Sequence, residues 1–378
     1  MENFTIYNPV KLHFGKNVLE NLPASAAQYG NRILLIYGKD SIKKSGLYEK
    51  IINLLKDFEV VEYQGIKSNP IIEDVNAAAK IARQNQVDLI IAVGGGSVID
   101  SAKVIASAIY YDGDAWDIMT NKIAVENSKP LFAILTLAAT GSEMNAFAVV
   151  QNKKTMEKIG WGNPPLSFPK ESFLDPMLTY TVSAKYTAYG MADMIAHSLE
   201  AYFGDGYSPL SDNFVIANIK EVIQAGKPLL NELNNYDLRA RIMYAGTIAL
   251  NGTMSNGKKY ADWGVHSLGH ILSLLYDMPH GASLTIAYPA WMKIHSVALA
   301  DKIIKLGKEI FMVDTVDETI SEFEKLFLAF DCPIRIGDWG IPKSDFETIE
   351  KYFIKNKVDG MVHKFNDTMR TEVLELMF

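Results

Sequence analysis

Between residues 30 and 136 the chain alternates short apolar runs with amphipathic segments, and this alternation limits the fold more than any other feature. The apolar runs lie at 32–38, 59–65, 87–95 and 130–137. The amphipathic segments between them lie at 45–58, 71–85 and 98–111. Apolar strands separated by helices are typical of βαβ units, whose parallel sheet is covered on both faces. We therefore expect a Rossmann-like α/β domain in this part of the chain.

The second half of the chain is expected to be almost entirely helical. Residues 146–152 and 157–163 form a predicted hairpin, and beyond residue 181 apolar residues recur at intervals of three and four. The predicted helices cover 184–203, 211–228, 236–255, 298–312, 317–330 and 367–378. A chain of 378 residues exceeds what one hydrophobic core usually covers. We predict an α/β domain at 1–181 and an all-α domain at 182–378.

A run of glycines stands between the third apolar run and the helix that follows it. The residues at this junction are Gly94, Gly95, Gly96 and Ser97. Glycines let the backbone approach a ligand closely, and the first turn of a helix offers free N–H groups to an anion. A turn that needs glycine only for packing is the alternative. Because such folds bind nucleotides at the carboxyl ends of their strands, we predict a phosphate cradle here.

Two further loops are expected at the same edge of the sheet. The loop after the fourth apolar run supplies hydroxyl groups from Thr136, Thr140 and Ser142. The turn after the first run, where an adenine ribose is expected, contains Gly38, Lys39, Asp40 and Ser41. A carboxylate beside the ribose favours NAD(H), whereas a lysine and a serine favour the 2′-phosphate of NADP(H). The pattern slightly favours NADP(H), because Lys39 and Ser41 outnumber Asp40.

Aspartate and histidine residues in the second half recur at the spacing of one helical turn. Asp193 and His197 are four residues apart, as are His266 and His270, and His280 follows. Residues at this spacing project from the same face of a helix. Together they can direct one carboxylate and two or three imidazoles at a single point, a donor set that suits Fe(II), Zn(II) or Mn(II). Histidines that contact neighbouring side chains or face water are the alternative.

Composition argues against several other classes of protein. The formal net charge of −7 disfavours nucleic-acid binding, which requires a basic surface. A single cysteine, Cys332, rules out an internal disulfide framework and a thiolate metal site. The first residues lack a basic region followed by an apolar run, and no apolar stretch is long enough to span a bilayer. We expect a cytoplasmic protein with a small-molecule substrate and neither a nucleic-acid nor a membrane partner.

Taken in order, the motifs of this chain resemble those of the iron-containing alcohol dehydrogenases. They are GGGSxxDxxK at 94–103, TxxxTGSE at 136–143, LDP at 174–176, GMADxxxHxxE at 190–200, HxxxH at 266–270 and HG at 280–281. The match covers almost the whole chain, and segments such as 37–50 look most like the butanol dehydrogenase and broad-range aldehyde reductase branch. The resemblance implies a dehydroquinate synthase-like, dinucleotide-binding N-terminal domain, a helical metal-binding C-terminal domain with a cleft between them, and a homodimer.

The resemblance also implies roles for individual residues. Those that match the metal ligands are Asp193, His197, His266 and His280, with Fe(II) as the implied ion and Zn(II) as the alternative. His270 matches a histidine near the substrate and is the expected catalytic residue. The expected cofactor contacts are Gly38, Lys39, Asp40, Ser41, Asn69, Gly94, Gly95, Gly96, Ser97, Asp100, Thr136, Thr140, Ser142 and Lys158.

These features predict a metal-dependent alcohol dehydrogenase, or aldehyde reductase, that transfers a hydride between NAD(P)H and a short- or medium-chain aldehyde such as butanal. Carbonyl reduction builds negative charge on oxygen, which a divalent metal stabilises. His270, one turn from His266, is the nearest candidate to supply the proton. A glycerol dehydrogenase or a dehydroquinate synthase-like metalloenzyme is the alternative. A cofactor-free metallohydrolase or a non-enzymatic metal-binding protein would leave the glycine turn unexplained.

Overall fold

The computed structural model of the protein describes residues 1–378, which form two compact units. The α/β unit comprises Tyr7–Ser183 and Leu233–Thr247. The helical unit comprises Met1–Ile6, Ala184–Glu232 and Ile248–Phe378. The predicted division between residues 181 and 182 instead assigns residues 1–6 to the α/β domain and residues 233–247 to the all-α domain. None of the helices is both long enough and apolar enough to cross a membrane.

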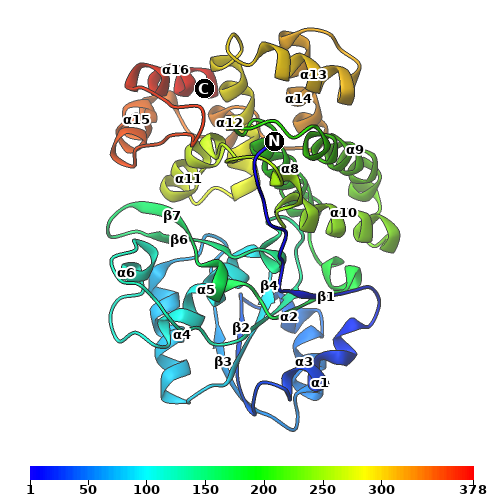
Figure 1. Ribbon diagram of the computed structural model, residues 1–378, viewed down its shortest axis with the longest axis vertical. Helices are drawn as coiled ribbons and strands as arrows, with labels where there is room; N and C mark the ends of the chain where they lie inside the picture. The colour runs from blue at the N-terminus through cyan, green and yellow to red at the C-terminus, as the bar shows by residue number, and fades with distance from the viewer. The chain divides into compact units, whose positions relative to one another are not determined.

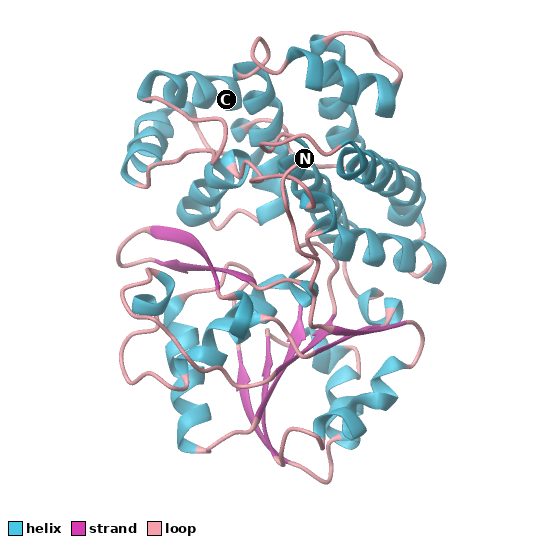
Figure 2. Ribbon diagram, in the orientation of Figure 1, coloured by secondary structure: helices cyan, strands magenta, loops and turns pink.

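A six-stranded parallel sheet forms the centre of the α/β unit (Figure 2). Its strands are β1 (Lys11–Phe14), β2 (Arg32–Tyr37), β3 (Glu59–Gln64), β4 (Leu89–Gly94), β5 (Leu131–Leu135) and β8 (Glu171–Leu174), in the order β1-β8-β5-β4-β2-β3. The predicted parallel sheet is therefore confirmed. The sequence did not predict β1 and β8, which are only four residues long and pair with each other.

Alternate residues of each inner strand enter two different hydrophobic cores, one on each face of the sheet. Ile33 and Leu35 of β2 pack with α1 (Leu22–Ala26) and α3 (Leu47–Leu54). Leu34 and Ile36 pack on the other face with α4 (Ile72–Gln84) and α5 (Gly96–Ala108). Figure 1 shows these helix pairs on the two sides of the sheet. Burial on both faces explains why the strands are continuously apolar.

Shorter elements complete the α/β unit. The predicted hairpin is present as the antiparallel strands β6 (Phe147–Asn152) and β7 (Glu157–Gly162). The short helices are α2 (Ser41–Lys44), α6 (Trp116–Met119) and α7 (Pro164–Ser167). Helix α10 (Tyr236–Ala249) is shorter than the predicted 236–255, since the chain turns at Gly252 with a φ of 97°.

The helical unit packs around two nearly fully buried helices, α8 (Ala184–Tyr202) and α12 (His280–Ile294). The other helices are α9 (Pro209–Asn231), α11 (Gly264–Tyr276), α13 (Ala300–Phe311), α14 (Val316–Ala329), α15 (Phe346–Lys355) and α16 (Asp367–Met377). Helix α8 contacts α9, α11 and α12, and α12 also contacts α14 and α16. The predicted all-α character of this part is confirmed, although α12 and α15 were not among the predicted helices and α11 was indicated only by the spacing of His266 and His270.

Candidate metal centre and cofactor-binding loops

Helix α8 contributes a carboxylate and an imidazole from one buried face. Every residue from Thr187 to Tyr202 is buried, because neighbouring helices cover α8 on all sides. Asp193 and His197 lie one turn apart on this helix and are only 2% and 5% exposed. The buried helix thus places a carboxylate and an imidazole in the interior, where they require polar partners or a metal.

Helix α11 contributes His266 near its first turn. The side chain of the fully buried Asp262 accepts a hydrogen bond from the N–H of Gly264 (3.1 Å), the first residue of this helix. Val265 and Leu268 pack in the core, and His266 itself is 5% exposed. The start of α11 therefore sets the position of the His266 ring.

Helix α12 begins at His280, whose side chain is 25% exposed. A β-carbon at the next residue, Gly281, would overlap the backbone carbonyl oxygen of Tyr189 on α8. The "HG" pair therefore has a packing reason: glycine lets the start of α12 approach α8 closely. This approach brings His280 to the turn of α8 that carries Asp193.

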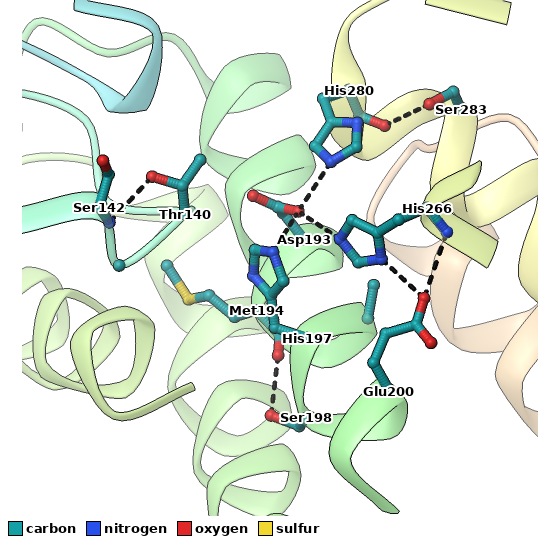
Figure 3. Close-up of polar contacts among 12 residues, drawn as sticks. Thr140, Ser142, Asp193, Met194, His197, Ser198, Glu200, His266, His280 and Ser283 are labelled. Carbon is teal, nitrogen blue, oxygen red and sulfur yellow. Dashed lines mark hydrogen bonds and ion pairs between the residues drawn. The ribbon is translucent and has the colours of Figure 1, made fainter. Parts of the chain in front are cut away.

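The four predicted metal ligands converge in what we call the acid–histidine cluster (Asp193, His197, His266 and His280; Figure 3). The distances from the Nε2 atoms to Asp193 Oδ1 are 3.7 Å for His197, 3.9 Å for His266 and 3.6 Å for His280. Potential ligand atoms of Asp193, His266 and His280 all lie within 4.8 Å of one another. His197 lies outside that tightest group of three but stacks on His266, with 4.7 Å between the ring centroids.

The electrostatics of the cluster fit a divalent cation. Burial, with a smaller contribution from His266, lowers the pKa of His197 well below its ordinary value. The imidazole is therefore neutral at pH 7, which is the form that binds a metal. Buried His197 Nδ1 has no hydrogen-bond partner in the protein. One carboxylate and three imidazoles around a common point match the ligands that Fe(II) and Zn(II) accept.

Glu200 is a site residue that was not among those predicted from the sequence. It lies on α8, seven residues after Asp193, and its Oε1 atom is 2.7 Å from His266 Nδ1. Burial, followed by the charge of Asp262, raises its pKa well above the ordinary value, while backbone hydrogen bonds from His266 and Trp263 lower it. Spacing could have indicated this residue, because positions 193, 197 and 200 share one helix face.

His270, the predicted catalytic residue, lies one turn after His266 on α11. Its ring centroid is 5.5 Å from that of His280 and 6.5 Å from that of His266. The residue is partly exposed, unlike the buried His266. It therefore neighbours the acid–histidine cluster and reaches the surface, as a proton-transferring group requires.

The predicted cofactor contacts lie in the α/β unit, most of them in loops that follow the carboxyl ends of strands. The glycine turn joins β4 to α5, and no side chain caps this end of α5. A β-carbon on Gly96 would overlap the side chain of Thr140, so glycine is needed there for packing. At Gly95 a β-carbon would lie 3.1 Å from Leu137 Cβ, and Gly95 itself is partly exposed. The uncapped helix end beside an accessible glycine fits an anionic phosphate.

Asp100, Ser142 and Lys103 form a buried polar network behind the glycine turn. Ser142 Oγ donates to Asp100 Oδ1 (2.5 Å), and Lys103 Nζ donates to Ser142 Oγ (2.7 Å). Lys103 also donates to Asn145 Oδ1 (3.0 Å) and the Phe147 carbonyl (2.6 Å). Burial lowers the pKa of Lys103 to about 8, although Asp100 and then Glu143 oppose this shift. The network shapes the loop that carries the predicted hydroxyl groups.

The other predicted contacts fall into separate groups. Lys158 on β7 donates to Asn69 Oδ1 (2.9 Å), so these two residues meet. Ser97 donates to the Ser68 carbonyl. On the turn after β2, Lys39, Asp40 and Ser41 are exposed. Gln64 Nε2 donates to Asp40 Oδ1 (2.9 Å), which fixes the carboxylate of that turn. This contact was not predicted from the sequence.

Comparison with known proteins agrees with this architecture. A family model described as iron-containing alcohol dehydrogenase matches residues 9–176, and its C-terminal counterpart matches residues 187–378. The chain is 39% identical to a probable NADH-dependent butanol dehydrogenase 1 of Bacillus subtilis (strain 168), over all of this chain and 99% of the relative. It is 32% identical to the NADPH-dependent aldehyde reductase YqhD of Escherichia coli (strain K12), over 93% and 92% of the two chains.

A solved structure shows the same fold. The crystal structure of NADH-dependent butanol dehydrogenase A from Thermotoga maritima superposes with a TM-score of 0.96, at 34% identity, over all of this chain and 99% of that chain. The resemblance inferred from the motifs is thus confirmed at the level of sequence and structure. The chain belongs to the iron-containing alcohol dehydrogenase family and is an oxidoreductase.

Proposed function

We propose that the protein transfers a hydride between NAD(P)H and a short- or medium-chain aldehyde, with the primary alcohol as the product of reduction. The observation that carries this proposal is the convergence of three imidazole Nε2 atoms on Asp193 Oδ1, at 3.6–3.9 Å. The activities after which the relatives are named, butanol dehydrogenase and aldehyde reductase, support the same reaction and favour it over glycerol oxidation or dehydroquinate synthesis.

The acid–histidine cluster would hold the metal, which we propose to be Fe(II), with Zn(II) as the alternative. A divalent ion supplies Lewis-acid polarisation of the carbonyl group. His197, whose ring is neutral, provides a nitrogen donor, and Asp193 provides an oxygen donor. His270 is placed to pass a proton between the substrate and the solvent, because it adjoins His280 and is partly exposed.

The nicotinamide cofactor would bind to the α/β unit. Its pyrophosphate is proposed to contact Gly95, Gly96 and Ser97, where the uncapped end of α5 stabilises negative charge. Its adenine ribose is proposed to lie against the turn that contains Lys39, Asp40 and Ser41. The slight preference for NADP(H) inferred from that turn stays a prediction, since relatives of this chain include both NADH- and NADPH-dependent enzymes.

We also propose that the enzyme acts as a homodimer in the cytoplasm. The buried, unpaired Cys332 is compatible with a reducing compartment. Sedimentation of the purified protein measures its oligomeric state directly, and a monomer at micromolar concentration would contradict the dimer.

The decisive experiment follows deuterium from the cofactor to the substrate. Protein reconstituted with Fe(II) or Zn(II) is mixed with butanal and with NADH or NADPH that carries deuterium at C4 of the nicotinamide. We expect deuterated butanol in the metal-loaded protein, and much less in a His266→Ala variant that also loses bound metal by elemental analysis. The absence of deuteride transfer to any short- or medium-chain aldehyde would refute the proposal.

A further inference from the structure

The side chain of Glu200 makes three contacts with the start of α11; the two with His266 are buried and the one with Trp263 is partly buried. The residue is 1% exposed and lies on α8, three residues after His197. Its Oε1 atom accepts from the His266 backbone N–H (3.2 Å) and lies 2.7 Å from His266 Nδ1. Its Oε2 atom accepts from the Trp263 backbone N–H (2.6 Å). Figure 3 shows the carboxylate of Glu200 on the opposite side of the His266 ring from Asp193.

These contacts determine which nitrogen of His266 carries the proton. Both oxygens of Glu200 already accept backbone N–H groups, so the carboxylate is held in place as an acceptor. A neutral imidazole beside such an acceptor carries its hydrogen on the facing nitrogen, Nδ1. The other nitrogen, Nε2, then presents its lone pair toward Asp193 Oδ1, 3.9 Å away.

We propose that Glu200 is a positioning residue that holds His266 in the Nδ1–H form, with Nε2 aimed at the metal position before any metal is bound. The inference rests on the proposed metal site and adds one element to it. Helix α8 supplies two ligands of the acid–histidine cluster, and through Glu200 it also orients a third ligand on α11. Carboxylates that hydrogen-bond to a metal-binding histidine commonly fix its ring in this way.

The first test uses the metal-free wild-type protein. Long-range proton–nitrogen NMR spectra of protein labelled with ¹⁵N-histidine distinguish an imidazole protonated on Nδ1 from one protonated on Nε2, and a His266→Gln variant assigns the signal. We expect His266 to carry its hydrogen on Nδ1. A hydrogen on Nε2, which would mean that Glu200 donates to the ring, would overturn the proposal. This measurement does not depend on how any variant folds.

The second test compares two buried glutamates. In Glu200→Gln the amide nitrogen cannot accept a hydrogen bond, so one of the N–H partners loses its acceptor. Glu143→Gln is the matched control, because Glu143 is also 1% exposed but lies in the α/β unit, with Oε1 accepting from Thr247. Competition with a chelator measures the dissociation constants for Co(II) and Zn(II), and thermal unfolding of the metal-free proteins measures their stability.

We expect Glu200→Gln to weaken metal binding by roughly 10- to 100-fold and to change the NMR signal of His266. Glu143→Gln should leave both unchanged. Wild-type affinity and an unchanged His266 signal in Glu200→Gln would overturn the positioning role while leaving the metal site intact. If the wild-type protein bound neither ion, the proposed function itself would fail. The two failures are therefore distinguishable.

Discussion

The buried His295, at the end of α12, should lower the free energy of unfolding of the helical unit in mild acid. The residue is 6% exposed, and its ring lies 4.6 Å from that of Trp291 and 5.4 Å from that of His363. Its Nε2 atom has no hydrogen-bond partner. Burial, followed by the charge of His363, lowers the pKa of His295 to about 4. The folded protein therefore holds this ring neutral, whereas the unfolded chain binds a proton near the ordinary pKa of about 6.5.

The direction and size of the effect follow from this difference in pKa. Above pH 6.5 both states are neutral and His295 does not affect the free energy of unfolding. As the pH falls from 6.5 toward 4, only the unfolded chain takes up the proton, so the folded state loses stability. Between pH 7.5 and pH 5.0 the loss amounts to about 2 kcal/mol. His295→Phe removes the titrating group and keeps a ring beside Trp291, so this part of the loss should disappear.

Hydrogen exchange of α12 peptides in increasing urea, corrected for the pH dependence of intrinsic exchange, measures the free energy of opening of this helix. The metal-free wild-type protein and His295→Phe are compared at pH 7.5 and pH 5.0. His295→Gln, which is polar but does not titrate, is the control and should also lose the acid sensitivity. A wild-type protein and a His295→Phe variant that lose the same stability between the two pH values would refute the reasoning.

Three further predictions concern the α/β unit and the proton path. Lys103→Met should destabilise the α/β unit by about 3–5 kcal/mol, because it removes the buried cation that offsets the charge of Asp100 and takes the donor away from Ser142 and the Phe147 carbonyl. Urea unfolding measures this loss, and a change below about 1 kcal/mol would contradict the prediction. Asp40→Gly should raise the ratio of kcat/KM with NADPH to kcat/KM with NADH by about tenfold, and Lys39→Ala should lower this ratio. If the ratio were unchanged in both variants, the ribose would have to lie elsewhere. His270→Ala should lower kcat by about 100-fold while metal content and cofactor affinity stay unchanged. If this variant turned over at the wild-type rate across the pH range, His270 would be excluded as the proton-transferring group.

The elements that the sequence predicts well are those whose burial repeats with a clear period. Strands β2, β4 and β5 are apolar on both faces, and helices α3 and α4 bury one face and expose the other, so these elements follow from the pattern of apolar residues. Strand β1 has only partly buried or exposed residues, and β8 begins with the buried but polar Glu171 and Ser172. Strand β1 enters the sheet only by pairing with β8 across 160 residues, and β8 in turn pairs with β5, which no local pattern records.

The proposed metal ligands could be predicted in part from the sequence, because helical spacing converts directly into a shared face. The pairs Asp193/His197 and His266/His270 needed only the assumption that each segment is helical. The resemblance to the family then separated the proposed ligands His266 and His280 from His270. Glu200 satisfies the same spacing rule, yet its partner lies on another helix, so its role depends on how α8 packs against α11. The roles of Gly281 and Gln64 likewise depend on contacts between elements distant in the sequence. Spacing within a helix identifies candidate ligands, whereas the residues that orient those ligands become visible only when the helices are packed.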